Sequence, residues 1–190
     1  MTFRDSTLLI VPTGSGFAIN HSRHADNSKK LVFRLYHHDM DVFDTLVAQF
    51  GAAAKDSLNG PGEPEAALAT PVDNLLRAYG ENILSRKVVL HAEVREDSGT
   101  VRPDFGVRVD GLMSGHVELK KPGTSLDPDT YGKTTHNGKQ WKRLSKLPNL
   151  LHTNGLEWRL WRYGELVAMA HLPVSSLTKF KGAVANRNSR

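Results

Sequence analysis

The sequence predicts an α/β fold, and three observations support this class. The chain has 190 residues, of which 39% are hydrophobic, so it is long enough to bury a core of its own. Short runs rich in β-branched and aromatic residues alternate with segments whose apolar residues recur at helical spacing. From Glu65 onward, these segments follow the order helix, strand, strand, strand, helix, strand, with extra strands after them.

Composition excludes several classes of protein. The chain contains no cysteine, which rules out a disulfide scaffold, a thiolate zinc site and a cysteine nucleophile. No apolar run approaches the ~20 residues that a membrane span needs, and the N-terminus lacks a basic segment followed by an apolar stretch. We therefore expect a soluble, cytoplasmic protein without a membrane partner.

Residues 1–60 differ in pattern from the rest of the chain. The apolar runs Leu8–Val11 and Leu31–Tyr36 predict short strands. A helix is predicted from Asp39, which is placed to cap its first turn. The helix ends at Asn59-Gly60-Pro61-Gly62, a strong helix-breaking sequence. We interpret residues 1–60 as an accessory extension packed on a core formed by residues 61–174.

Within residues 61–174, the elements can be placed in order. A helix is predicted over Pro71–Tyr79, extending back to about Glu65, because proline suits the first turn of a helix. Asp110-Gly111 is a hairpin-type turn. A second helix, closed by Pro148, precedes the last strands. The remaining predicted ranges are Val88–Val94, Val101–Val109 and Gly115–Leu119 for strands, Lys139–Leu147 for the helix, and Leu150–His152, Glu157–Trp161 and Leu166–His171 for the late strands. Residues 175–190 are polar and basic and are interpreted as a tail or linker.

The main chemical signal lies on two of these strands. Asp104 opens one strand, whereas Glu118 and Lys120 are two residues apart on the next and therefore point to the same face. If the two strands pair through the Asp110-Gly111 turn, Asp104 and Glu118 meet near one end of the sheet. Two carboxylates without a nitrogen or sulfur ligand suit Mg²⁺, and a lysine beside them can stabilise charge on a phosphate. These groups predict metal-assisted hydrolysis of a phosphodiester.

The segments Pro103-Asp104 and Glu118-Leu119-Lys120 resemble the motif of the PD-(D/E)xK nuclease superfamily. The order αβββαβ resembles the core of that superfamily, which implies a restriction-endonuclease-like central mixed sheet flanked by helices, here with extra N-terminal strands and a helix. Gln140-Trp141 and the segment from Leu147 to Trp158 resemble a narrower group. These are the N-terminal nuclease domains of restriction–modification polypeptides that also carry a DNA adenine methyltransferase. The resemblance covers Glu65 to His171.

The resemblance implies a role for each matching residue. Asp104 and Glu118 would bind Mg²⁺, for which Mn²⁺ can substitute, and Lys120 would position or activate the attacking water. Glu65 would supply a further acidic ligand from the first core helix, with Glu63 and Glu81 as alternatives. Gln140 would help to organise the catalytic site. The sequence departs from one common form of the motif at Leu144, where that form has tyrosine.

Charge is distributed unevenly and favours a nucleic-acid partner. The net charge is +5, but residues 1–119 carry −4 and residues 120–190 carry +9. A strongly basic half is typical of proteins that bind phosphate backbones. The residues we expect to contact the DNA backbone are Lys121, Lys139, Lys142, Arg143 and Lys146.

The leading hypothesis is a Mg²⁺-dependent DNA endonuclease domain of a restriction–modification-type system. A methyltransferase or other specificity domain, on the same or another chain, is the expected partner, because no DNA-reading module is evident in this sequence. A homodimer is a further expectation, because a double-strand break needs two active sites. Two alternatives stay open: a catalytically inactive DNA-binding module or subunit of a larger defence complex, and a nuclease that acts on RNA or branched DNA.

Overall fold

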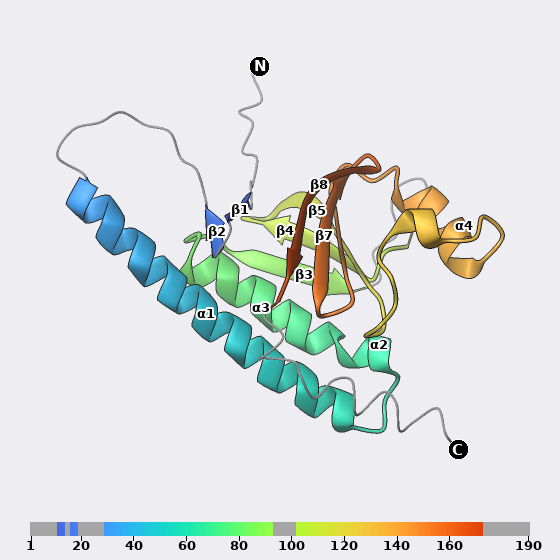
Figure 1. Ribbon diagram of the computed structural model, residues 1–190, viewed down its shortest axis with the longest axis horizontal. Helices are drawn as coiled ribbons and strands as arrows, with labels where there is room; N and C mark the ends of the chain where they lie inside the picture. The colour runs from blue at the N-terminus through green and yellow to red at the C-terminus, as the bar shows by residue number, and fades with distance from the viewer. Residues whose placement is uncertain (1–10, 14–15, 19–28, 93–101, 173–190) are drawn as a thin grey trace.

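A six-stranded mixed sheet forms the centre of the computed structural model (Figure 1), which describes residues 11–13, 16–18, 29–92 and 102–172. The strands follow one another in space in the order β3-β4-β5-β6-β7-β8. All neighbouring pairs are antiparallel except β5 and β6, which are parallel. The bounds are Val88–Ala92 for β3, Phe105–Val109 for β4, Leu112–Leu119 for β5, Leu150–Thr153 for β6, Glu157–Arg162 for β7 and Glu165–His171 for β8.

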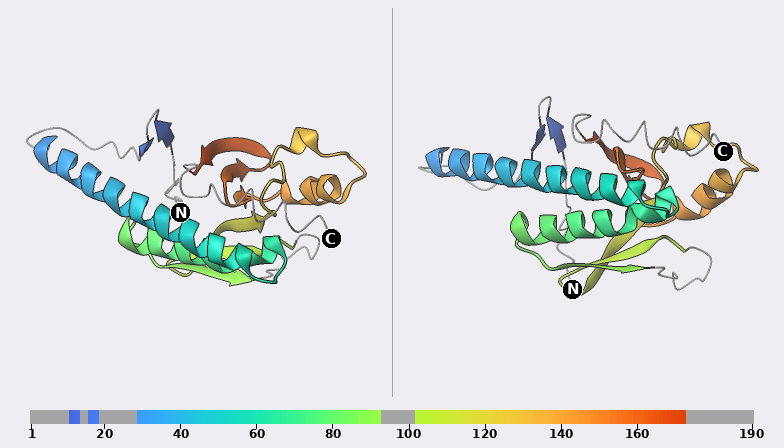
Figure 2. Two further views of the ribbon diagram at one scale, coloured as in Figure 1. Left: turned by 60° about the horizontal axis from the view of Figure 1, so that its bottom comes forward. Right: turned by 90° about the horizontal axis from the view of Figure 1, so that it is seen from below.

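Two long helices cover one face of the sheet. Helices α1 (Lys29–Asn59) and α3 (Ala69–Asn82) run side by side (Figures 1 and 2), and α2 (Pro64–Ala67) is a single turn between them. The main hydrophobic core lies beneath them, where Phe50 of α1 packs edge-on against Trp158 of β7. Val117 and Leu119 of β5 point into this core because alternate residues of a strand share a face.

The opposite face of the sheet is covered in part by α4 (His136–Leu144), which lies in the crossover between the parallel strands β5 and β6. Leu144 and Leu147 form a second, smaller core with Leu150 and Trp161. The ring of Trp141 lies 4.7 Å from that of Trp161 in an edge-on arrangement. The short 3₁₀ helix Pro128–Thr130 lies in the loop that precedes α4.

From α3 to β6 the helices and strands follow the predicted order of helix, three strands, helix and strand, and Asp110-Gly111 forms the predicted turn between β4 and β5. Asp110 and Gly111 have φ values of +50° and +84°, as a two-residue hairpin turn of this type requires. The structure thus confirms a mixed α/β fold. Helix α4 begins three residues earlier than predicted and ends three earlier, and the predicted Glu65–Tyr79 helix is divided at Leu68 into α2 and α3.

The prediction for Leu31–Tyr36 is wrong, because these residues belong to α1 rather than to a strand. Short apolar runs fit a strand and a helix equally well, and the helix here continues without interruption from Lys29. Asp39 consequently lies inside the helix and does not cap it. The end of that helix at Asn59 agrees with the predicted break.

Several other predictions lie partly or wholly outside the described residues. They concern residues 8–10, 93–94, 101 and the basic segment 175–190. Strands β1 (Val11–Thr13) and β2 (Gly16–Ala18) form a separate antiparallel pair, of which only the first overlaps a predicted strand. Among the described residues, no helix is both long and apolar enough to cross a membrane.

Candidate metal centre

The antiparallel pairing of β4 with β5 determines how the candidate site is built. Phe105 pairs with Val117, so Asp104, which precedes Phe105, lies opposite Glu118 at the end of this ladder. Residues opposite each other on antiparallel strands project from the same face. The two carboxylates therefore lie on the face of the sheet that carries α4, because Val117 and Leu119 point into the core beneath α1 and α3.

Three carboxylates meet at this point, one from α2, one from the residue before β4 and one from β5. One oxygen from each of Glu65, Asp104 and Glu118 lies within 4.8 Å of the other two. Glu65 is in α2, and this helix lies near the end of β5. These are the three residues assigned to the metal from the sequence, and the structure brings them together. A group of three carboxylate oxygens at this spacing could hold a metal ion.

Glu118 is the most enclosed member of the cluster, with only 1% of its surface exposed. Its Oε1 accepts a hydrogen bond from Nζ of Lys120 at 2.6 Å and another from Nε2 of Gln140 at 2.5 Å. Its Oε2 is buried and has no hydrogen-bond partner among the described residues. A buried carboxylate oxygen is costly to leave without a partner, so this atom is suited to bind a cation.

Burial raises the pKa of Glu118 to about 7. The ammonium group of Lys120 opposes this shift, whereas the neighbouring carboxylates of Asp104 and Glu65 add to it. A carboxyl group whose pKa is raised by burial and by like charges gains strongly from a bound cation, because the cation favours the ionised form.

Lys120 is almost as enclosed as Glu118, with 6% of its surface exposed. Besides Glu118, its Nζ donates to the backbone oxygen of Leu119 at 3.0 Å and lies 3.7 Å from Oε1 of Glu65. The side chain of Glu65 is 44% exposed, so the cluster opens to solvent on the α2 side. The predicted lysine therefore lies among the carboxylates rather than on the surface.

Asp104 is held from one side by the backbone. Its Oδ2 accepts the N–H of Leu119 at 2.7 Å, a bond that joins the residue before β4 to the last residue of β5. This bond orients one carboxylate oxygen by the backbone of the strand that carries Glu118. The orientation of Asp104 is thus linked directly to the position of Glu118.

His152, which sequence reasoning did not assign to the site, lies on the strand next to Glu118. His152 of β6 pairs with Glu118 of β5, is 1% exposed, and stacks on Trp141 with the ring planes 13° apart. Burial, with Lys120 and Arg159 nearby, lowers the pKa of His152 to about 3, so its ring is neutral at pH 7. No sequence signal marked this residue, because a single histidine in an apolar strand is not informative.

The basic residues predicted to contact DNA are exposed, as the prediction requires. Lys139, Lys142, Arg143 and Lys146 lie on or directly after α4, and Lys121 follows β5. Gln140, in the same helix, reaches Glu118. Helix α4 thus connects the exposed basic residues with the carboxylate cluster.

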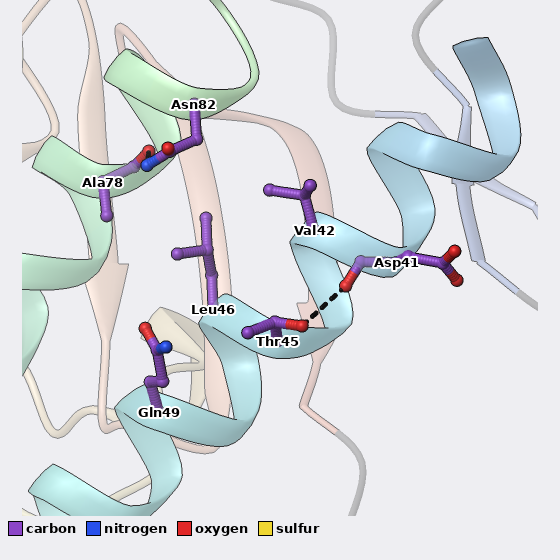
Figure 3. Close-up of a pocket in the computed structure, with 7 residues that line it drawn as sticks. All are labelled: Asp41, Val42, Thr45, Leu46, Gln49, Ala78 and Asn82. Atoms are coloured by element: carbon purple, nitrogen blue, oxygen red, sulfur yellow. Dashed lines mark hydrogen bonds between the residues drawn. The ribbon is translucent and has the colours of Figure 1, made fainter.

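A separate cavity of about 380 Å³ lies between α1 and α3 (Figure 3). Figure 3 shows Gln49 and Asn82 on the facing helices, and the hydroxyl of Thr45 donating to the backbone oxygen of Asp41. Asp41 is the one acidic residue among those that line the cavity, and its carboxylate points away from Gln49 and Asn82 (Figure 3). The cavity shares no residue with the carboxylate cluster.

Comparisons with known proteins bear on the fold. No protein-family model and no curated protein sequence matches the chain. Among solved structures, the chain is similar to one in the cryo-EM structure of the DrdV–DNA complex, with a TM-score of 0.53 and 19% sequence identity. The match covers 74% of this chain but only 13% of the other, so this fold corresponds to a small part of a much longer protein.

Proposed function

We propose that the chain is a Mg²⁺-dependent nuclease domain that hydrolyses DNA phosphodiester bonds within a restriction–modification-type system. The observation that carries the proposal is the meeting of Glu65, Asp104 and Glu118 around a buried carboxylate oxygen that has no protein partner among the described residues. The similarity to a chain of the DrdV–DNA complex supports a DNA-related function. The arrangement also agrees with the PD-(D/E)xK resemblance of the sequence.

The side chains of the cluster would have different roles in hydrolysis. Glu65, Asp104 and Glu118 would hold Mg²⁺, which supplies polarisation of the phosphate and of the attacking water when it is bound. Lys120, whose Nζ lies between Glu118 and Glu65, would orient that water and balance negative charge on the phosphate. Water would then add to phosphorus and release a proton to solvent, the bond to the leaving 3′ or 5′ oxygen would break, and the departing oxygen would take up a proton from solvent.

The substrate would approach over α4. Lys139, Lys142, Arg143 and Lys146 are exposed on this side of the molecule, and Gln140 of the same helix contacts Glu118. Phosphate contacts of this kind hold the DNA backbone without selecting a sequence. We therefore propose that sequence recognition comes from a methyltransferase or other specificity domain, and that two nuclease domains act together to cut both strands.

In this proposal, residues 61–174 form the nuclease unit. Residues 1–60 form an accessory extension, and residues 175–190 form a basic tail or linker. This division stays a prediction. Helix α1 contributes Val47, Phe50, Ala54 and Leu58 to the same core as the sheet, so an intact α1 would be needed for a stable nuclease unit.

The direct test is cleavage of supercoiled plasmid by the purified protein with Mg²⁺ or Mn²⁺, with and without EDTA. We expect nicked or linear product from the wild type, and at least a hundredfold less from Asp104→Ala and Lys120→Ala. Asp73→Asn is the control, because Asp73 pairs with Arg77 on α3 and lies outside the carboxylate cluster. Undiminished cleavage by Asp104→Ala and Lys120→Ala would refute the assignment.

Metal titration distinguishes a nuclease from a DNA-binding module without catalysis. Calorimetry should detect Mn²⁺ binding to the wild type and to Asp73→Asn but not to Glu118→Ala. DNA binding that is steeply salt-dependent yet unaffected by metal and by Glu118→Ala would instead support the binding module.

A further inference from the structure

The β4–β5 hairpin contains an irregularity that determines which residue faces Asp104. Val109 pairs with Leu112 and Arg108 with Met113, but Val107 pairs with Gly115, so Ser114 is an extra residue in β5. Such a β-bulge shifts the register of everything beyond it by one position. Without it, the Asp110-Gly111 turn would place Val117, rather than Glu118, opposite Asp104.

A shift of one position reverses the faces of a strand. In the regular register, Glu118 would point toward the core beneath α1 and α3, and Val117 would point toward α4. The cluster of Glu65, Asp104 and Glu118 could not form in that register. The bulge at Ser114 is therefore a geometric condition for the carboxylate cluster, even though Ser114 lies at the other end of β5.

One residue contacts this bulge through both its backbone and its side chain. The backbone oxygen of Asn149 accepts the N–H of His116 at 3.0 Å, and its Nδ2 donates to the backbone oxygen of Ser114 at 3.0 Å. Nε of Arg162 lies 3.4 Å from Oδ1 of Asn149, which agrees with this orientation of the amide. Asn149 immediately precedes β6, the strand that pairs with β5 in parallel.

Close packing adds to these contacts. A Cβ atom on Gly115 would lie 3.1 Å from both Cβ and the backbone oxygen of Asn149, which is tighter than most such contacts, so a larger residue at position 115 would require Asn149 to shift by a few tenths of an ångström. The extra residue of β5 is thus held between a glycine that permits the approach and an asparagine that supplies the hydrogen bonds.

We propose that Asn149 is a positioning residue for the metal centre: by holding the Ser114 bulge, it sets the register that brings Glu118 to the same face as Asp104. The inference rests on the proposed function insofar as the carboxylates bind a metal ion. Its geometric part, the register of β5 against β4, can be measured without any metal.

The register is tested with cysteine pairs, because the chain has no native cysteine. The Asp104→Cys/Glu118→Cys pair reports the bulged register, and the Asp104→Cys/Val117→Cys pair reports the regular one. Dibromobimane, which becomes fluorescent when it joins two nearby thiols, is the probe. We expect the first pair to react in the otherwise wild-type chain, and Asn149→Asp to transfer the reaction to the second pair.

Mn²⁺ affinity is measured in parallel on chains that retain the carboxylates. Asn149→Asp replaces the donor facing the Ser114 oxygen with an acceptor, and we expect it to weaken Mn²⁺ binding by about tenfold or more. In Gly115→Ala, the added methyl group would push against Asn149, so we expect the same effect on Mn²⁺ binding. This variant replaces Asn149→Asp in the experiment if Asn149→Asp does not fold. Leu58→Ala, in the α1 core, is the control for destabilisation alone and should change neither the register nor the Mn²⁺ affinity of the folded protein.

The outcomes distinguish the positioning role of Asn149 from the proposed metal-dependent function. If Asn149→Asp and Gly115→Ala keep the 104/118 cross-link and bind Mn²⁺ as Leu58→Ala does, the positioning role is wrong. If the register shifts but the wild type binds no Mn²⁺, the positioning of Glu118 stands and the proposed metal-dependent function fails.

Discussion

Nε2 of Gln140 lies 2.5 Å from Oε1 of Glu118, so helix α4 is joined to strand β5 at the most buried carboxylate among the described side chains. This contact leaves Oε2 of Glu118 as the oxygen without a protein partner among the described residues. It also connects the exposed basic residues of α4 to the carboxylate cluster. Both features that the proposed nuclease function requires therefore adjoin helix α4.

Gln140→Leu should weaken Mn²⁺ binding by roughly tenfold to a hundredfold, because the loss of a residue that orients a metal ligand typically lowers metal affinity by this factor. The substitution removes the donor to Oε1 of Glu118 and keeps the size of the side chain. The measurement is calorimetric titration, with Asn137→Ala in the same helix as the control. Equal affinities for the two variants would contradict the role assigned to Gln140.

Glu65→Gln and Glu63→Gln form a matched pair two residues apart. Only Glu65 belongs to the carboxylate cluster, so Glu65→Gln should raise the Mn²⁺ dissociation constant roughly tenfold, whereas Glu63→Gln should leave it unchanged. The same titration decides between the two residues, both of which the sequence left as candidates. A larger effect from Glu63→Gln would show that the wrong glutamate was assigned.

The raised pKa of Glu118 predicts how stability depends on pH in the metal-free protein. Its pKa rises from 4.5 to about 7 on folding, so the folded protein binds more protons than the unfolded chain between these values. The contribution of Glu118 to the free energy of unfolding is therefore complete below pH 4.5 and is lost as pH rises through 7, by about 3 kcal/mol. Glu118→Gln should be more stable than the wild type at pH 8 but similar at pH 4.5.

Chemical denaturation at several pH values with EDTA measures this difference. Adding Mg²⁺ at pH 8 should stabilise the wild type and leave Glu118→Gln much less affected, because the cation favours the ionised carboxylate. A difference between the two proteins that did not vary with pH would contradict the raised pKa.

His152 predicts the opposite pH dependence. Its pKa falls from 6.5 to about 3 on folding, so the unfolded chain binds the extra proton between these values. The stability that the neutral ring provides is complete above pH 6.5 and is lost as pH falls toward 3. His152→Phe keeps a ring to stack on Trp141. Between pH 7 and pH 4.5, its free energy of unfolding should fall by about 3 kcal/mol less than that of the wild type. Parallel curves for the two proteins would show that His152 is not held neutral.

Lys142→Ala and Arg143→Ala should each reduce the salt dependence of DNA binding. Each phosphate contact contributes about 0.9 to the slope of log K against log salt concentration, and its loss should lower the slope by about 1. Fluorescence anisotropy with a labelled duplex at several salt concentrations gives the slope. Lys87→Ala, an exposed lysine directly before β3, is the control. If the control and the α4 variants have the same slope, DNA does not lie along α4.

The sequence by itself was sufficient for the elements with strong local signals. The Asp110-Gly111 turn requires positive φ angles that few residues adopt, and Asn59-Gly60-Pro61-Gly62 marks the end of α1, so these boundaries were predictable. Pro148 was a weaker guide, because α4 ends at Leu144. The sequence also singled out Asp104, Glu118 and Lys120, because their spacing is a local property of two adjacent strands, whereas Glu65 was one of three candidates with Glu63 and Glu81. It failed at Leu31–Tyr36, where an apolar run carries no signal that separates a strand from a helix.

The tertiary structure decided what depends on contacts between distant residues. Whether Glu65 or Glu63 reaches the cluster depends on how α2 lies at the end of β5, and the burial of His152 depends on Trp141 from another element. Above all, the face on which Glu118 lies depends on one extra residue at Ser114, which is held by Asn149, 35 residues away in the sequence. The residues of the candidate metal centre could be chosen from the sequence, but a one-residue register sets their geometry, because successive side chains of a strand point to opposite faces.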